Sequence, residues 1–291
     1  MYTLETPMEL RYEAEDEDTF YQAYLGDALR MDEIIDKASI DLVVTSPPYN
    51  IGKEYEDVLD IDDYLDFMQQ WMEKAEKTLS PDGSFWLNIG FRKEGDGNQY
   101  VPWEYEVYPI IRDEMDISFV QQVIWHYKAG VNCRYRFSPR KETWLYCVSD
   151  LDDYTFNLDD VRVPAKYPNQ KKDGELKVNP KGKNPGDVWD IPKVTSGKGR
   201  ASPERTEHPA QYPEEVIERV IKTSSDPGDV IFDPFLGSGT TMKVARDLNR
   251  SCIGIELDEE YIDDIIQERV FEDYSSPVDT SDEQMSLDDL A

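Results

Sequence analysis

The chain has 291 residues, and its 62 acidic and 31 basic side chains give a net charge of −31 at pH 7. The length allows one large domain or two ordinary ones, and an aromatic content of 12% argues against disorder over the whole chain. The apolar stretches are too short for a transmembrane helix, and the first residues do not resemble a signal peptide, so no membrane partner is expected. Three widely spaced cysteines and two histidines argue against a disulfide framework and a zinc site, so no metal is expected.

An acidic excess of this size is typical of proteins that work in molar salt, where charge keeps the surface hydrated. We therefore expect a cytoplasmic protein from a high-salt, haloarchaeal type of cytosol; the alternative is an acidic interaction surface in an ordinary cytosol. The charge is uneven, because residues 128–205 hold 16 basic and 11 acidic side chains. Residues 161–205 are also rich in Pro, Gly and Asn, as loops are. This stretch is expected to contact DNA phosphates, with a solvated loop as the alternative.

Residues 1–19 are acidic and weakly patterned, which predicts a flexible N-terminal arm. Short β-rich runs predict strands, and apolar residues at helical spacing predict helices. In chain order the expected elements are a strand over 40–45, a helix over 62–79, a turn at 81–83, strands over 84–89, 119–127 and 143–148, a helix that opens at Pro213, a strand over 230–233, a helix over 241–248, a strand over 252–256 and a helix over 258–271. Alternation of strands and helices implies an α/β fold with a parallel sheet. Residues 275–291 lack any basic residue and predict a disordered acidic tail.

The segment 233–241 (DPFLGSGTT) leaves a predicted strand and enters a predicted helix. Gly237 and Gly239 allow positive φ angles and a close approach of a ligand to the backbone, and the helix N-terminus favours negative charge. A P-loop is excluded because no Lys follows the glycines, and the third glycine of the dinucleotide fingerprint is missing. Glu256 ends the next strand, where a carboxylate can accept hydrogen bonds from ribose hydroxyls. Together these features indicate an adenosine-bearing ligand without a pyrophosphate; a plain tight turn is the alternative.

The segment 45–50 (TSPPYN) directly follows another predicted strand. Its two prolines fix the backbone and lack N–H groups, so their carbonyl groups can point outward as acceptors. A flat ring could stack on Tyr49 while its amino group donates to Ser46 and to the Pro47 carbonyl. An ordinary Pro-Pro turn is the alternative interpretation.

Both motifs, in this order, resemble the β group of amino-methylating DNA methyltransferases, in which the SPPY motif is catalytic and the DPFxGxGT motif binds S-adenosylmethionine. The resemblance spans about residues 20–272 and includes segments 26–28 (GDA), 184–189 (NPGDVW), 207–213 (EHPAQYP) and 254–257 (GIEL), and Tyr261. It implies a Rossmann-like methyltransferase fold with a mostly parallel, seven-stranded sheet. The catalytic and cofactor-binding domain would comprise residues 20–127 and 207–274, and residues 128–206 would form an inserted target-recognition region.

The resemblance further implies methyl transfer to cytosine N4 in a short site of double-stranded DNA, such as the palindrome CTAG, by base flipping and direct displacement. Serine in place of aspartate in the SPPY motif resembles the N4-cytosine branch, although some N6-adenine enzymes also carry serine. Adenine N6, RNA as substrate, and a non-catalytic DNA-binding role are the alternatives. A homodimer and a cognate restriction endonuclease are further partners of this family. Residues 284–290 (QMSLDDL) faintly resemble a sliding-clamp-binding peptide, but they lack its aromatic pair.

By the same resemblance, the catalytic residues are Ser46, Pro47, Pro48 and Tyr49. The expected cofactor-binding residues are Asp27, at the adenine amino group; Glu256, at the ribose; and Asp233, Pro234, Phe235, Gly237, Ser238, Gly239, Thr240 and Thr241, around the methionine end and the helix start. His208 and Pro209 belong to a segment that lies beside the cofactor in this family. The expected DNA contacts are basic residues of the insert, of which several should touch phosphate: Lys128, Arg134, Arg136, Arg140, Lys171, Lys172, Lys181, Lys183, Lys198 and Arg200.

Overall fold

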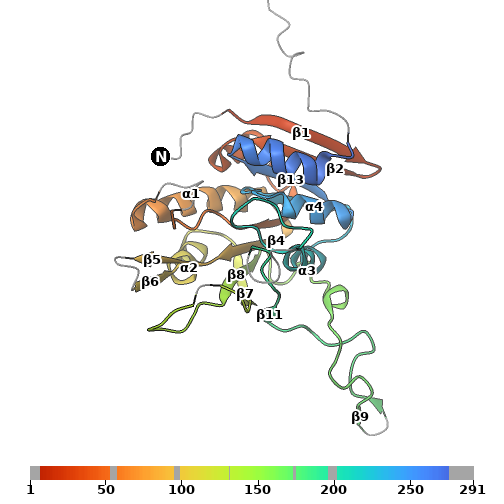
Figure 1. The fold of residues 1–291 in the computed structure, drawn as a ribbon. Helices are drawn as coiled ribbons and strands as arrows, with labels where there is room; N and C mark the ends of the chain where they lie inside the picture. The colour runs from red at the N-terminus through yellow and green to blue at the C-terminus, as the bar shows by residue number, and fades with distance from the viewer. Residues whose placement is uncertain are drawn as a thin grey trace, which may run out of the picture.

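A nine-stranded sheet forms the centre of the protein. The computed structural model describes residues 7–52, 58–94, 99–130, 132–172, 175–195 and 202–274. The strand order is β1-β2-β13-β12-β3-β4-β8-β7-β11, and five of the eight neighbouring pairs are parallel. Their bounds are Glu9–Asp16 (β1), Thr19–Leu25 (β2), Ile40–Thr45 (β3), Leu79–Ile89 (β4), Ser118–His126 (β7), Lys141–Val148 (β8), Val188–Asp190 (β11), Val230–Asp233 (β12) and Ser251–Glu256 (β13). The predicted mostly parallel α/β sheet is thus confirmed (Figure 1).

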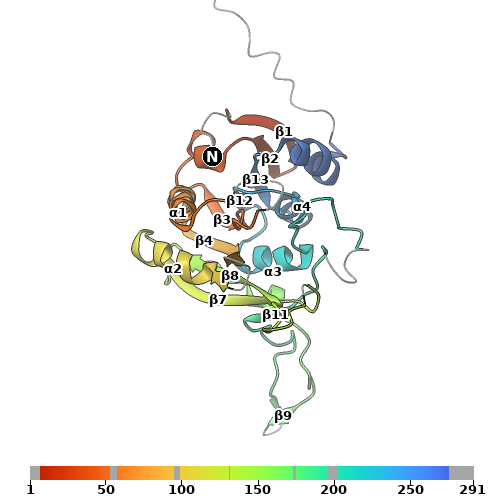
Figure 2. The same ribbon diagram turned by 60° about the vertical axis from the view of Figure 1, so that its left-hand side comes forward.

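Helices cover both faces of this sheet (Figure 2). One face carries η1 (Ala28–Glu33), α1 (Ile61–Thr78) and α2 (Trp103–Asp113); the other carries α3 (Glu214–Ser224), α4 (Thr240–Asp247) and η4 (Tyr261–Phe271). Each face buries its own apolar core, and the aromatic side chains Trp71, Trp86 and Trp144 are almost fully enclosed. Burial on both faces explains why β3 and β12 consist mainly of apolar residues.

The central predicted elements are confirmed, and the differences lie at their ends. β3 and β12 have the predicted bounds, and α1 is shifted by one residue. The turn expected at 81–83 is instead a bulge inside β4, because Leu79 pairs with Ile40 while Ser84 pairs with Leu42. Pro213 is the N-cap of α3 rather than its first residue. The last helix was predicted over 258–271; its π-helical part is shorter and covers Tyr261–Phe271.

The prediction of a flexible arm over residues 1–19 is wrong for its second half. Residues 9–16 form β1, which pairs with β2 as an antiparallel hairpin at the sheet edge. Tyr12 and Ala14 alternate with charged residues and pack into the core beneath η4. Arg11 ties the same strand to η4 through a two-point contact with Asp263, at 2.9 and 2.6 Å. The edge strands β1 and β11 also raise the strand number from the expected seven to nine.

The predicted insert over 128–206 is not separate from the sheet, because β8 and β11 lie inside it and pair with β7. The part that leaves the body is an arm between η2 (Leu158–Val161) and β11, with the short strands β9 (Lys171–Lys172) and β10 (Glu175–Leu176) at its far end (Figure 1). Residues 162–171 and 176–181 contain no buried side chain. Two small strands, β5 (Phe91–Glu94) and β6 (Gln99–Pro102), form a separate hairpin. The tail predicted over 275–291 lies outside the described residues, as does the clamp-like segment 284–290.

Among the residues that the structure describes, no helix combines the length and the apolar character that crossing a membrane would require.

Candidate active site

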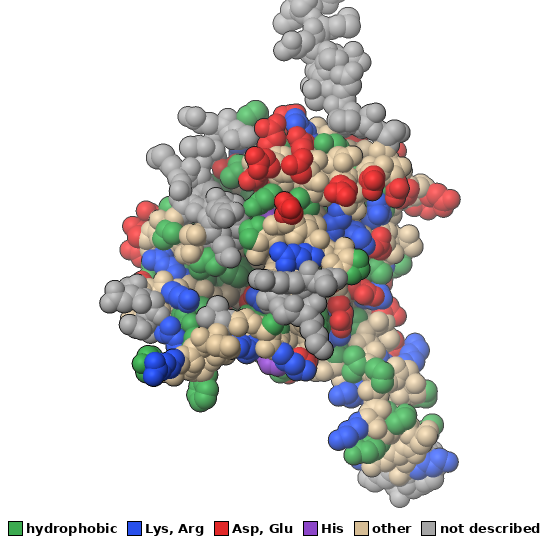
Figure 3. Space-filling model, viewed as in Figure 1, with side chains coloured by type: hydrophobic (Ala, Val, Ile, Leu, Met, Phe, Trp, Pro, Cys, Tyr) green, Lys and Arg blue, Asp and Glu red, His purple; other side chains and the backbone are tan. Residues whose placement is uncertain are grey.

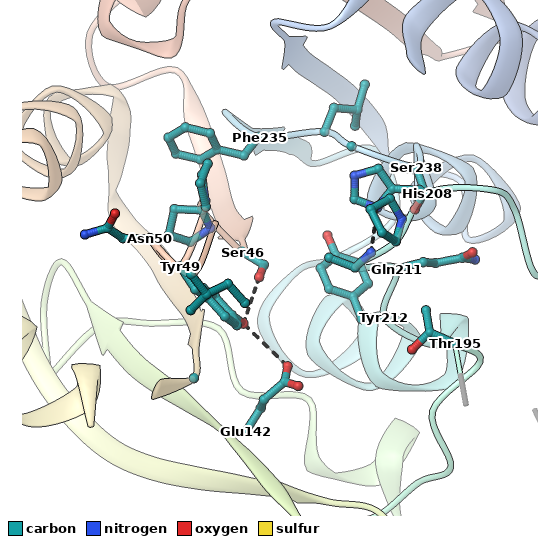
Figure 4. A pocket seen from close by; sticks show the side chains of 18 of the residues that line it. Ser46, Tyr49, Asn50, Glu142, Thr195, His208, Gln211, Tyr212, Phe235 and Ser238 are labelled. Atoms are coloured by element: carbon teal, nitrogen blue, oxygen red, sulfur yellow. Dashed lines mark hydrogen bonds between the residues drawn. The ribbon is translucent and has the colours of Figure 1, made fainter. Parts of the chain in front are cut away.

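A cavity of about 1140 Å³ opens at the carboxyl ends of β3, β12 and β13. Parallel pairing of β3 with β12 and of β12 with β13 brings together motifs that are nearly 190 residues apart in the sequence. The segment that follows β3, the glycine-rich loop after β12 and the end of β13 form much of the wall, and the segment 207–212 closes another side (Figure 4). The carboxyl edge of a parallel sheet is where α/β proteins bind their ligands.

Asp233 holds the two motifs together from behind the cavity. Its carboxylate accepts hydrogen bonds from the hydroxyls of Thr45 (2.6 Å), Thr241 (2.6 Å) and Tyr212 (3.0 Å) and from the Phe235 amide (3.1 Å). The side chain is fully buried, and burial raises its pKa against the opposing effect of these donors. Asp233 is not among the residues that line the cavity, and it fixes the walls from behind; its predicted contact with the cofactor stays a prediction.

The glycine-rich loop adopts the backbone that its glycines predict. Gly237 has φ 55° and Gly239 has φ 69°, both in the left-handed region. A Cβ on Gly237 would lie 3.2 Å from the His208 ring, so this position needs glycine for space as well. His208 in turn stands edge-on to Tyr261, with 4.7 Å between ring centroids. The segment 207–213 therefore packs against the glycine-rich loop; its predicted place beside the cofactor stays a prediction.

Glu256 closes the far end of this loop. Its carboxylate accepts from the Gly237 amide at 2.7 Å and from the Asp258 amide at 2.8 Å. The side chain lines the cavity but is only 9% exposed, and this burial raises the pKa of Glu256 to about 7. A carboxylate at this strand end suits a ligand with vicinal hydroxyl donors.

Asp27 presents a buried oxygen that lacks a partner among the described residues. Its Oδ1 caps η1 by accepting from the Leu29 amide at 2.9 Å, whereas Oδ2 has no hydrogen bond. The residue lines the cavity and is 3% exposed, and burial raises its pKa. An unsatisfied acceptor of this kind calls for a donor from a ligand, such as an amino group.

The structure places the other predicted cofactor residues in two layers. Pro234, Phe235, Gly237 and Ser238 belong to the cavity wall. Gly239, Thr240 and Thr241 lie behind it, where Thr240 bonds to Ser238 at 2.9 Å. Sequence reasoning missed Arg269 of η4, which donates to the Ser238 carbonyl at 2.9 Å and to the Thr240 hydroxyl at 2.7 Å. No local motif marks Arg269, because only the packing of η4 brings it to the loop.

The SPPY segment forms the opposite wall of the cavity. The Ser46 hydroxyl donates to the Tyr49 hydroxyl at 3.0 Å, and Pro47 and Pro48 also line the cavity. The Tyr64 hydroxyl donates to the Pro48 carbonyl at 2.8 Å, which fixes the turn from below. Asn50, at φ 56°, holds the backbone of Leu59 through both ends of its amide, so it stabilises the loop.

Sequence reasoning did not single out Asn88 and Glu142, which contact Tyr49, or Lys193, which contacts Glu142. The Asn88 amide satisfies all its contacts when its oxygen accepts from the Trp144 indole (3.1 Å) and its nitrogen donates to Tyr49 and Glu142 (2.5 and 3.0 Å). Glu142 also bonds to Lys193. These residues come from β4, β8 and the segment after β11, so the pairing of these strands within the sheet brings them together.

The predicted DNA contacts fall into two groups. Lys128, Arg134, Arg136 and Arg140 occupy the loop after β7, which reaches the cavity through Gly130 and Pro139. Lys171, Lys172, Lys181 and Lys183 lie on the arm. Lys128 pairs with Asp190 at 2.8 Å and Lys181 with Asp159 at 2.7 Å, so both already have an acidic partner. Lys198 and Arg200 lie outside the described residues. On the face shown in Figure 3, acidic side chains gather over β1 and β2, and basic ones are more frequent on the arm.

A parallel sheet with a polar cavity at its carboxyl edge, walled by a glycine-rich loop and an SPPY turn, defines an α/β enzyme of the methyltransferase type. The chain belongs to the DNA methylase family N6_N4_Mtase, whose profile matches residues 40–268. It is 51% identical over 241 residues to the type II methyltransferase M.ScaI of Streptomyces caespitosus, and this match covers 82% of the chain and 78% of that protein.

Solved structures show the same fold. The PvuII DNA methyltransferase, described as cytosine-N4-specific, superposes with a TM-score of 0.68 at 22% identity and covers 83% of both chains. TTHA0409 of Thermus thermophilus, a putative DNA modification methylase solved with S-adenosyl-L-methionine, gives a TM-score of 0.59 at 23% identity and covers 84% of this chain and 90% of its own.

Proposed function

We propose that this protein is a site-specific methyltransferase that transfers a methyl group from S-adenosylmethionine to N4 of cytosine in double-stranded DNA. The observation that carries the proposal is the position of Ser46 at the end of β3, across one cavity from the glycine-rich loop. A neutral hydroxyl at this place, rather than a carboxylate, favours cytosine. Adenine N6 is the second candidate, because the same wall can hold either amino group.

The cavity residues fit S-adenosylmethionine. The free oxygen of Asp27 would accept from the adenine amino group, and the Glu256 carboxylate would accept from the ribose hydroxyls. Phe235 and Ser238 would flank the methionine end. When bound, this cofactor supplies a methyl group that is already activated by the sulfonium, so the protein needs mainly to position the base.

The chain would hold the target base on the SPPY wall. The base must leave the duplex, at a cost of a few kcal/mol. Its ring would stack on Tyr49, while Ser46 and the Pro47 carbonyl accept from its amino group and turn the nitrogen lone pair towards the methyl group. The arm and the loop after β7 would contact the DNA around the site. A homodimer and a cognate endonuclease are included in the proposal, the second because the relative M.ScaI is named a type II enzyme.

Nucleoside mass spectrometry tests the function directly. DNA incubated with the purified protein and S-adenosylmethionine in molar KCl is expected to contain N4-methylcytosine. N6-methyladenine instead would retain the enzyme class and overturn the choice of base. No modified base in DNA or in RNA, with cofactor binding intact, would favour a non-catalytic DNA-binding role.

Cofactor affinity is expected to rise with pH through about 7. Burial raises the pKa of Glu256 to about 7, so the carboxyl is partly protonated at neutral pH. Hydroxyl donors prefer its ionised form, and therefore binding strengthens as the proton is lost. Titration calorimetry between about pH 6 and pH 8 checks this expectation. Glu256→Gln should bind more weakly and without this pH dependence, whereas the exposed control Glu260→Gln should match the wild type. An affinity that falls with pH would contradict the assignment.

DNA affinity is expected to depend weakly on salt. Each phosphate contact contributes about 0.9 to the slope of log affinity against log salt, so an enzyme adapted to molar salt cannot rely on many of them. Two of the predicted contacts, Lys128 and Lys181, already pair with carboxylates. Fluorescence anisotropy across a KCl series measures the slope. A slope that corresponds to about eight or more released counterions would contradict the high-salt adaptation.

A further inference from the structure

A chain of hydroxyl groups links the methyl-accepting wall to a carboxylate. The Ser46 hydroxyl donates to the Tyr49 hydroxyl at 3.0 Å, and the Tyr49 hydroxyl donates to Oε2 of Glu142 at 3.4 Å (Figure 4). Asn88 donates to both the Tyr49 oxygen and the same carboxylate oxygen, at 2.5 and 3.0 Å, and so aligns them. With the Asn88 amide in the orientation that satisfies all its contacts, the Tyr49 proton can bond to Glu142, and the hydrogen bonds can run in one direction from Ser46 to Glu142.

Lys193 completes the far end of the chain. Its ammonium contacts the other oxygen of Glu142 and lies over the Tyr127 ring, 4.1 Å from the centroid. The side chains of Glu142 and Lys193 are 13% and 22% exposed, so the pair is half-buried beside the cavity. The lysine balances the negative charge of Glu142 without occupying Oε2, which stays directed at Tyr49 and Asn88.

Methyl transfer to an amino group requires a proton acceptor in the site. As the carbon–sulfur bond breaks and the carbon–nitrogen bond forms, the amino nitrogen acquires a positive charge and must lose one proton. Ser46 can accept a hydrogen bond from this nitrogen because its own proton is directed at Tyr49. A serine hydroxyl alone is a weak base, whereas a carboxylate two bonds further along the chain is a competent acceptor.

We infer that Ser46, Tyr49 and Glu142 form a relay that carries the departing proton from the target amino group to the Glu142 carboxylate. The N–H bonding electrons stay on nitrogen, Ser46 Oγ takes the proton and passes its own to Tyr49, and the Tyr49 proton moves to Oε2 of Glu142. Glu142 thereby becomes a neutral acid and later returns its proton to water in the cavity. Glu142 is a positioning residue and a proton acceptor that does not touch the base.

The relay rests on the proposed amino-group methyl transfer, but it serves cytosine and adenine equally. It also supplies a function for the Tyr49 hydroxyl, which ring stacking does not use. Ser46 carries no negative charge, unlike an aspartate at this position. In the relay, Glu142 supplies that charge through Tyr49.

Two variants test the relay in the full chain. Glu142→Gln keeps the shape and removes the proton acceptor, and Tyr49→Phe keeps the stacking ring and removes the linking hydroxyl. Single-turnover methylation of duplex DNA should slow about 100-fold in each variant. The dissociation constants for S-adenosylmethionine and for unmethylated DNA should stay at the wild-type values. The double variant should be no slower than the slower single variant, because one break already interrupts the chain. Glu106→Gln, the same substitution on the exposed face of α2, is the matched control.

Wild-type turnover rates in both single variants would overturn the relay. So would weaker binding with an unchanged rate, or rate losses that multiply in the double variant. If Glu142→Gln does not fold, Tyr49→Phe alone decides, since it deletes one partly buried oxygen. N6-methyladenine as the wild-type product would overturn the proposed base and leave the relay to be measured on adenine. A wild type that methylates no nucleic acid would overturn both proposals.

Discussion

Ser46→Ala is expected to slow methyl transfer by about 100- to 1000-fold while the affinity for S-adenosylmethionine is unchanged, since a precisely placed polar group at a reacting centre contributes on this scale. The hydroxyl would orient the amino group, and alanine offers no acceptor. The cofactor wall is built from other residues, chiefly Asp27, Phe235 and Glu256, so its binding should not change. Transfer of a tritiated methyl group to duplex DNA gives the rate, and calorimetry gives the cofactor affinity.

Ser39→Ala is the matched control for this variant. Ser39 is exposed just before β3, at the opposite end of the strand that leads to Ser46, so the substitution should leave the rate unchanged. Pro47→Ala should resemble Ser46→Ala in direction, because the proline fixes the carbonyl that accepts the second hydrogen bond. Wild-type activity in Ser46→Ala would show that the SPPY wall is not where the base reacts.

Asp233→Ala is expected to destabilise the protein by about 3–5 kcal/mol, which corresponds to a melting temperature lower by roughly 10 °C. Alanine leaves the hydroxyls of Thr45, Thr241 and Tyr212 and the Phe235 amide without their common acceptor in a fully buried place. Part of the cost is recovered because the Tyr212 and Thr241 oxygens lie 2.6 Å apart, and one hydroxyl can donate to the other once Asp233 is gone. Thermal denaturation followed by circular dichroism measures the shift.

Loss of the same carboxylate should also disconnect the two walls of the cavity. Among the side-chain hydrogen bonds of the described residues, Thr45 reaches the glycine-rich loop only through Asp233. Cofactor binding should therefore weaken in Asp233→Ala even below its melting temperature. Asp264→Ala, which removes an exposed carboxylate from η4, should alter neither property. A melting temperature within about 2 °C of the wild type would contradict the role assigned to Asp233.

The buried centre of the sheet could be predicted from the sequence. β3 and β12 are short, β-branched runs bounded by turns, and their burial on both faces makes the apolar signal continuous. β1 was not predicted because charged residues occupy its solvent-facing side. They hide the alternation of apolar and polar residues, and the segment resembles a charged tail. α2 was missed because Pro109 lies inside it.

The parts of the candidate site that directly follow a strand could be predicted from the sequence. The parts that depend on which strands pair in the sheet could not. Ser46 and Gly237 belong to compact motifs directly after β3 and β12. Asn88, Glu142 and Lys193 carry no local signature, and they meet only because β8 pairs antiparallel with β4 and β11 places its following segment beside them. The role of Asp233 could not be read from its motif, since burial is decided by Tyr212 and α4 packing over it.

The arm has a consequence for how such an enzyme can change over evolutionary time. Since residues 162–171 and 176–181 contain no buried side chain, substitutions there should alter the free energy of unfolding by less than about 0.5 kcal/mol. The residues around the cavity and those of the proposed relay belong to the sheet and to the segments packed on it, where substitutions are expected to cost more. Under the DNA-contact role proposed for the arm, sequence preference would be able to change there one exposed side chain at a time, while the residues around the cavity stay the same.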